Sequence, residues 1–265
     1  MSATINAKVT ILVGAGAVEN AWKPILNIFR LINGDETDQD SANFLFAKSI
    51  CALRLYSKLP QRAKQLKEEQ ELVSSMKEVI GDSLKLAQKD GTLKPRKEFA
   101  TMLDKFVLCS PNNLFGFVTT NWDTVIDAEA DRWVKDKYLD IESAKVFHIH
   151  GSIEAHEHLY LPSETSMENY RSDAENERLG YAHFATFKLL KEANSIILYG
   201  LSLDPLDAEL NLLLGGAFKA SKTIKEVIIV NPNYQLVRKR VKILLFRKTG
   251  IAIRCFDPEN LEIEL

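Results

Sequence analysis

Two polar segments of this 265-residue sequence carry side chains suited to acid–base chemistry. The segment 120–123 follows a predicted strand and contains Asn121 and Asp123. An uncharged amide can orient a water molecule or a ribose hydroxyl, and a carboxylate can favour a developing positive charge. His150 ends another predicted strand, and Gly151 after it would let a ligand approach closely; imidazole is the usual general base near neutral pH. The alternatives are a helix cap at 120–123 and a packing role for His150.

A glycine turn after the first apolar run is a candidate phosphate loop. Gly14, Ala15, Gly16 and Ala17 follow the run 8–13, as expected where a buried strand ends in a tight turn. Such a turn lets backbone amides approach a pyrophosphate at a helix N-terminus. The full G-x-G-x-x-G fingerprint fails because Glu19 holds the third glycine position, which argues against an ordinary dehydrogenase. A strand-to-helix turn without a ligand is the alternative.

Four histidines form two H-x-H pairs that could suggest a metal site. His148 and His150 are two residues apart and would face the same way on a strand, and His156 and His158 repeat the spacing. A hydrolytic zinc or manganese site also needs a carboxylate partner, and none stands at ligand spacing. We therefore expect no metal, and a metal-dependent hydrolase is kept as an alternative.

The elements that must position these residues are strands separated by helix-length segments. Apolar runs cover residues 8–13, 115–118, 145–149, 195–199 and 226–230, and 251–253 is a candidate edge strand. This alternation predicts an α/β fold with a Rossmann-like parallel sheet and crossover helices. Ligands of such sheets bind outside the carboxyl ends of the strands, so the polar segments should converge on one crevice.

Between the first two runs the apolar pattern changes to helical spacing. Apolar residues recur at steps of three, four and seven: Leu66, Val73, Met76, Ile80, Leu84 and Ala87. We predict a helical insertion subdomain at 35–110 within a Rossmann domain formed by 1–34 and 111–265. Pro95 would suit the first turn of the last insertion helix.

Composition limits the partners and the compartment. Thirty-four basic and thirty-six acidic residues give a net charge of −2, so direct binding to nucleic acid or to a membrane surface is not expected. Cys51, Cys109 and Cys255 have no C-x-x-C spacing, which argues against a disulfide framework and a zinc ribbon and favours a reducing compartment. With no signal-peptide pattern and no long apolar run, we expect a cytoplasmic protein.

Five polar blocks follow one another along the chain: Gly14-Ala15-Gly16, Thr120-Asn121-Trp122-Asp123, His150-Gly151-Ser152, Gly200-Leu201-Ser202-Leu203-Asp204 and Val230-Asn231-Pro232-Asn233. In this order they resemble the SIR2 (sirtuin-like) superfamily over residues 9 to 233, leaving the insertion and the C-terminal segment unmatched. The resemblance implies that Asn121 and His150 are the catalytic pair. It also implies NAD-binding positions at Gly14, Ala15, Gly16, Ala17, Thr120, Asp123, Gly200, Ser202, Asp204 and Asn231.

The branch of the superfamily that the chain resembles is the zinc-less bacterial one. Sirtuin deacylases carry a four-cysteine zinc module that this sequence lacks, so protein deacylation is not expected. The zinc-less branch has helical insertions and hydrolyses NAD to ADP-ribose and nicotinamide during phage infection. The resemblance thus implies an NAD+ hydrolase (NADase) that cleaves the N-glycosidic bond, takes NAD as its substrate without a metal, and serves antiviral defence.

An NAD hydrolase that is always active would starve its host, so its activity must be controlled. After the catalytic core and the insertion are counted, too few residues remain for a separate sensor domain. We therefore expect a regulatory protein subunit and a homo- or hetero-oligomer. The alternative from another class is a non-catalytic module that senses NAD or ADP-ribose through the same crevice.

Overall fold

The computed structural model describes residues 8–34, 36–107, 114–138, 141–154 and 159–265. Its main strands are β1 (Lys8–Val13), β4 (Leu114–Thr119), β5 (Val146–His148), β6 (Ser195–Tyr199), β7 (Glu226–Val230), β8 (Ala252–Asp257) and β9 (Asn260–Glu264). In this part of the chain they form one seven-stranded sheet, ordered β5-β4-β1-β6-β7-β8-β9. Every neighbouring pair is parallel except β8 with β9. The predicted α/β, Rossmann-like fold is confirmed, and β9 rather than β8 forms the sheet edge.

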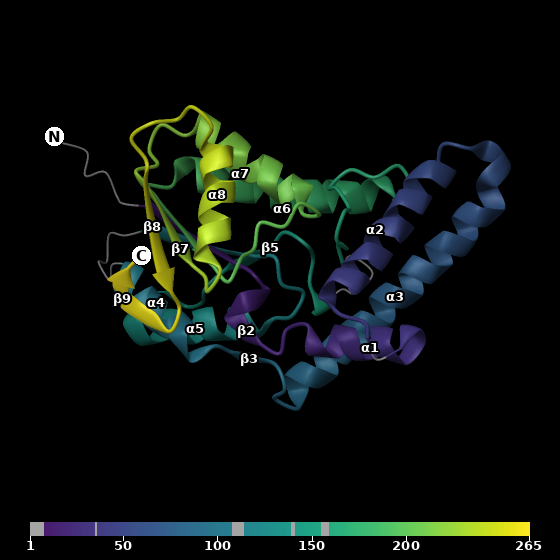
Figure 1. Cartoon of the computed structure of the whole chain (residues 1–265), viewed down its shortest axis with the longest axis horizontal. Coiled ribbons are helices and arrows are strands. Elements are labelled where there is room, and N and C mark those ends of the chain that lie inside the picture. Colours follow the sequence, from purple (N-terminus) through teal and green to yellow (C-terminus); the bar gives the residue numbers. More distant parts are fainter. Residues whose placement is uncertain (1–7, 35, 108–113, 139–140, 155–158) are drawn as a thin grey trace.

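Helices cover both faces of this sheet. The α-helices of the described residues are α1 (Lys23–Asn33), α2 (Gln39–Tyr56), α3 (Ala63–Lys89), α4 (Lys97–Phe106), α5 (Val125–Lys137), α6 (Asp173–Glu192), α7 (Ala208–Ala220) and α8 (Tyr234–Leu245). Helices α6, α7 and α8 pack side by side on one face, and α4 and α5 lie on the other (Figure 1). Within the described residues, no helix has both the length and the apolar character needed to cross a bilayer.

The central strands are buried on both faces, which explains their apolar runs. Along β1, Val9, Ile11 and Val13 belong to the core beneath α4 and α5, whereas Leu12 belongs to the core beneath α6, α7 and α8. Successive side chains of a strand point to opposite faces, so a strand covered on both sides must be apolar at nearly every position. The β-branched run 8–13 meets this requirement and therefore becomes the central strand.

The chain between β1 and β4 is mostly helical. Helices α2 and α3 form an antiparallel hairpin that projects from the sheet (Figure 1). Helix α4 instead lies against the sheet, because the ring of Phe99 packs on Tyr199 with centroids 5.4 Å apart. The start predicted for this helix at Pro95 is wrong: α4 begins at Lys97, and Pro95 pairs with Val18 in a small ribbon of β2 (Val18–Glu19) and β3 (Lys94–Pro95).

Ion pairs fasten the α2–α3 hairpin to the segment before α6. Arg54 of α2 pairs with the buried Glu168, and Lys77 of α3 lies 3.4 Å from Glu164. Burial lowers the pKa of Lys77, while the Glu164 carboxylate opposes that change. Removing one partner from such a buried pair leaves an uncompensated charge, which is costly. The hairpin is therefore held in a fixed place beside the ends of the strands.

The strand order places a crevice at one point of the sheet. Numbered along the chain, the six parallel strands run 3-2-1-4-5-6, which is the order of dinucleotide-binding Rossmann sheets. The order reverses at β1, where β4 lies on one side and β6 on the other. The crossovers on the two sides of β1 leave in opposite directions, so a crevice is expected outside the carboxyl ends of the strands at this point.

Candidate active site

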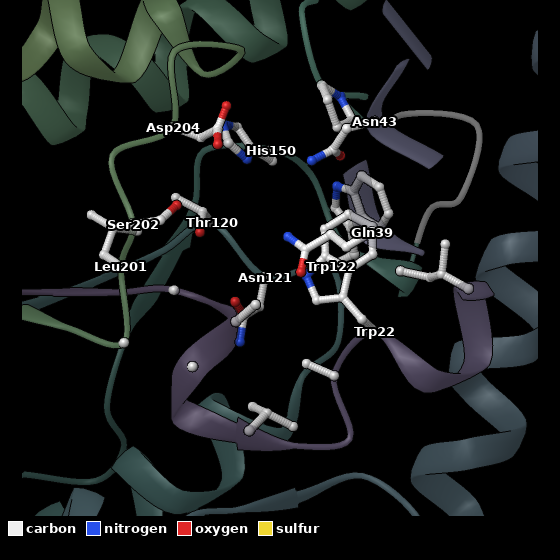
Figure 2. Close-up of a pocket in the computed structure, with 18 of the residues that line it drawn as sticks. Trp22, Gln39, Asn43, Thr120, Asn121, Trp122, His150, Leu201, Ser202 and Asp204 are labelled. Carbon is white, nitrogen blue, oxygen red and sulfur yellow. The ribbon is translucent and has the colours of Figure 1, made fainter. Parts of the chain in front are cut away.

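A cavity of about 600 Å³ lies at this switch point, outside the carboxyl ends of β1, β4 and β6. Its volume is in the range of small-molecule sites, roughly 300–1,000 Å³. Every residue predicted for the site lines it except Ala17: Gly14, Ala15, Gly16, Thr120, Asn121, Asp123, His150, Gly200, Ser202, Asp204 and Asn231. Figure 2 shows Thr120, His150, Ser202 and Asp204 on one side of the hollow, facing α2.

The glycines of the turn after β1 serve loop packing. A Cβ on Gly14 would lie 2.7 Å from the Gly200 carbonyl oxygen, and one on Gly16 would lie 2.8 Å from the Gly200 Cα. Gly200 itself has φ +61°, and its Cβ would lie 2.5 Å from the Ala17 nitrogen. The loops after β1 and β6 therefore touch through backbone alone, which only glycine permits.

The amides of the turn are mostly used inside the protein. Gly14 donates to the Tyr199 carbonyl at 2.9 Å, Gly16 to the Gly200 carbonyl at 2.9 Å, and Ala17 to the Gly14 carbonyl at 3.0 Å. This leaves Ala15 as the amide of the turn that can donate to a ligand. The expectation that several amides cradle a pyrophosphate is therefore wrong for this loop, because Tyr199 of β6 and Gly200 directly after it accept from two of them.

Asn121 presents an unpaired amide to the cavity. Its side chain is buried, with the residue 6% exposed, yet neither Oδ1 nor Nδ2 has a hydrogen-bond partner among the described residues. Its backbone is fixed, because its amide donates to Thr119 Oγ1 at 3.0 Å and its carbonyl oxygen lies 3.0 Å from His148 Nδ1. An unpaired buried polar group costs about 1–3 kcal/mol. A ligand in the cavity would be able to complete the hydrogen bonds of this amide.

His148 holds Asn121 and is not a partner of His150. Its second ring nitrogen lies 2.9 Å from Asp127 Oδ2, so both nitrogens face acceptors and both donate when the ring is protonated. Burial lowers the pKa of His148, but the bond and charge of Asp127 outweigh it, and the pKa is raised. The expectation that His148 and His150 face the same way is wrong, because β5 ends at His148 and the chain turns before His150.

His150 has a carboxylate beside it. Its Nε2 lies 3.2 Å from Asp207 Oδ1, close enough for an ion pair but not aligned as a hydrogen bond. Burial lowers the pKa of His150, whereas the charge of Asp207 and a hydrogen bond with the Thr120 backbone raise it, and the pKa ends above its usual value. A neighbouring carboxylate stabilises the imidazolium that forms when the ring accepts a proton. Asp207 would thus stabilise His150 after the ring accepts a proton.

Tyr160 fixes the plane of the His150 ring. The two rings stack with centroids 4.8 Å apart and planes 6° from parallel. The Tyr160 hydroxyl donates to Glu209 at 2.5 Å, and its carbonyl accepts from the Trp122 indole at 3.0 Å. One residue therefore joins the segment that carries Asn121 to the segment that carries His150.

Asp123 is a desolvated carboxylate that lines the same cavity. It is 3% exposed, and burial raises its pKa to about 6, although the amide of Val125 donates to its Oδ1 at 3.1 Å. Helix α5 begins at Val125 and its N-cap is Thr124, so the bond to Val125 is a local turn just before the helix and Asp123 is not the N-cap. A carboxylate with little water around it interacts strongly with a nearby positive charge. Asp123 can thus both fix the turn before α5 and face a ligand.

Two other predicted residues use their side chains within the protein. Asn231 donates from Nδ2 to the Leu201 carbonyl at 3.0 Å and accepts from the Asn233 amide. Asp204 accepts from the Leu206 amide at 2.9 Å. Both residues shape the loops after β6 and β7, so their contribution to the cavity is to hold its wall.

Several lining residues were missed by the sequence analysis. Asp207 and Tyr160 lie outside the five polar blocks. The only sequence signal for Asp207 was that it stands between two other acidic residues, Asp204 and Glu209. The helical segment between β1 and β4 adds Lys23, Arg30, Gln39, Asn43 and Arg96 to the lining. Trp22 of the same segment, which was not missed, lines the cavity as well. Lys23, Arg30 and Arg96 are exposed cations, which suits an anionic ligand.

Backbone strain gathers at the cavity. Among the described residues, four that are not glycine have positive φ, and three of them line the cavity: Asn20 at 57°, Ser163 at 74° and Leu203 at 56°. Such conformations cost of order 1–3 kcal/mol each and cluster at active sites and ligand clamps. The positive φ angles therefore favour a functional role for this cavity.

The metal alternative receives no geometric support from His148, which spends both nitrogens on Asn121 and Asp127. Among the described residues there is no group of three or more His, Cys, Asp and Glu side chains that could hold a metal ion. His156, His158 and Cys109 lie outside the described residues.

No protein-family model and no curated protein matches this chain.

Proposed function

We propose that this protein hydrolyses NAD+ to ADP-ribose and nicotinamide. The observation that carries the proposal is the meeting of Asn121, with its unpaired buried amide, and His150, with its carboxylate partner, in one cavity at a Rossmann switch point. The resemblance to SIR2 proteins assigns the two residues to one reaction. That reaction requires both side chains to reach the same substrate, and a common cavity supports this. We infer no role for a metal.

The two residues divide the chemistry of N-glycosidic cleavage. Breaking the bond builds positive charge on the ribose while nicotinamide leaves neutral, so the site needs orientation more than an acid. The Asn121 amide would bind a ribose hydroxyl or the attacking water. His150 would accept the proton, with Asp207 stabilising the imidazolium, and Asp123 would face the developing positive charge.

Cationic side chains of the helical segment would hold the pyrophosphate. Lys23, Arg30 and Arg96 line the cavity, and the Ala15 amide lies at the start of η1 (Ala15–Ala17). Side-chain cations thus replace the backbone cradle that the glycine turn does not supply, because Gly14, Gly16 and Ala17 donate elsewhere. Cationic side chains bind phosphate oxygens through strong, charge-assisted hydrogen bonds.

The test is cleavage of NAD+ followed by mass spectrometry, with any co-encoded proteins present. Asn121→Ala and His150→Ala should each lower the rate by about a hundredfold or more. Asn27→Ala, which removes an exposed amide of α1 outside the cavity, should not change it. Asn121→Ala should keep or raise the melting temperature, because it removes two unpaired polar atoms. Binding of NAD+ without turnover in all of these chains would favour a non-catalytic sensor.

We further propose that the protein is a cytoplasmic antiviral effector that a regulatory subunit or self-assembly switches on. Asn20, Ser163 and Leu203 have strained backbones and lie in segments that line the cavity. A partner could bring these segments into the active arrangement. The pure chain should therefore cleave NAD+ slowly, and its rate should rise with the partner or with protein concentration. Full activity of the dilute chain alone would contradict this part of the proposal.

A further inference from the structure

Asn43 on α2 is a second buried amide with an unpaired atom in the cavity. The residue is 8% exposed, and its Oδ1 has no hydrogen-bond partner among the described residues. The proposed chemistry does not use it. As with Asn121, a buried amide oxygen without a donor is unfavourable unless a ligand supplies one.

The packing of α2 places Asn43 beside the segment that carries Asn121. Asn43 and Phe46 are three residues apart, so they share one face of the helix. The Phe46 ring packs edge-on against Trp122 with centroids 6.3 Å apart, and Trp122 directly follows Asn121. The same apolar contact that docks α2 therefore carries Asn43 to the wall of the reaction site.

Gln39 adds a second amide on the same face of α2. It is the first residue of the helix, four residues before Asn43, and it is exposed at the cavity. Figure 2 shows Gln39 and Asn43 on one side of the hollow together with the indoles of Trp22 and Trp122. The two amides and the two indoles at one wall combine hydrogen-bonding and stacking groups.

We propose that Gln39, Asn43 and Trp22 form the subsite for a planar heterocyclic base of the dinucleotide. Asn and Gln amides carry a donor and an acceptor side by side, and so do the edge of adenine and the carboxamide of nicotinamide. An indole can stack on either ring. The subsite rests on the proposed function, and it gives the helical segment a direct part in substrate recognition.

Two ligands show which base the subsite binds. ADP-ribose contains adenine but no nicotinamide, and nicotinamide mononucleotide contains nicotinamide but no adenine. Calorimetric titrations use the full chain with His150→Ala, which prevents turnover, and add Gln39→Ala, Asn43→Ala or the control Asn27→Ala. Gln39→Ala and Asn43→Ala should each lower the affinity for one of the two ligands by about fivefold and leave the affinity for the other unchanged. The control should change neither.

A selective loss for ADP-ribose assigns the subsite to adenine, and a selective loss for the mononucleotide assigns it to nicotinamide. An equal loss for both ligands, or for neither, overturns the subsite and leaves the proposed function standing. Failure of the parent chain to bind either ligand overturns the proposed function together with the subsite. Gln39 is exposed, so Gln39→Ala should fold normally. This variant therefore tests the subsite even if Asn43→Ala is too unstable to be titrated.

Discussion

A methyl group added at Gly200 tests whether the cavity depends on the backbone contact between the loops after β1 and β6. Gly200 has φ +61°, where an L-residue costs about 1–2 kcal/mol. The new Cβ would also lie 2.5 Å from the Ala17 nitrogen and 2.5 Å from the Gly16 carbonyl carbon. Both atoms are backbone and cannot rotate away, so overpacking adds about 1–3 kcal/mol.

The two costs together predict that Gly200→Ala loses about 2–5 kcal/mol of stability. For a chain of this length each kcal/mol lowers the melting temperature by about 2–4 °C, so we expect a fall of about 4–20 °C in thermal unfolding followed by circular dichroism. Binding of NAD+ should weaken as well, because the displaced loop carries Gly16 and Ala15.

Gly180→Ala is the matched control. Gly180 lies in α6, where an added Cβ meets no atom within 4 Å, so this variant should gain about 0.5–1 kcal/mol. If Gly200→Ala melted with the wild type or with this control, the two loops could separate freely. That result would refute the packing role assigned to the glycines.

Three further predictions concern charge and metal. Asp207→Asn removes the charge that raises the pKa of His150, so the acidic limb of the pH–rate profile should move to lower pH; an unmoved limb would mean that Asp207 does not act on the base. Burial raises the pKa of Asp123 from 3.8 to about 6. The folded protein therefore binds this proton more tightly than the unfolded chain does, and the wild type loses stability as the pH rises between these two values. The melting temperature of Asp123→Asn relative to wild type should therefore be higher at pH 7 than at pH 4, and equal differences would contradict the buried charge. Addition of EDTA should leave NAD+ cleavage unchanged, whereas loss of activity that zinc or manganese restores would revive the metal-dependent alternative.

The strands and the general place of the site could be predicted from the sequence. The run 8–13 is mostly apolar because β1 is covered on both faces, and this requirement can be recognised from the residue types alone. Polar residues that follow parallel strands reach one edge of the sheet whatever the details of packing, which is why Asn121 and His150 line the same cavity.

The roles of individual groups in the site depended on neighbours that are distant in sequence. The glycine turn was expected to offer its amides to a phosphate, but β6, nearly two hundred residues later, accepts from Gly14. His148 and His150 were expected to face one way, but the strand ended between them because the chain turns toward Tyr160. Local spacing fixes side-chain direction only while the element continues.

The sequence by itself determined the sheet, the order of the polar segments and the edge at which they meet, because strand periodicity and chain order suffice for these. Only the tertiary structure decided that Asp207 stands beside His150, that α2 brings Asn43 to the cavity, and that Asn121 has no partner. Hydrogen bonds and ion pairs act over about 3 Å, so their partners are chosen by the packing of whole elements. That packing arises from contacts such as Phe46 with Trp122, which join residues far apart in the chain.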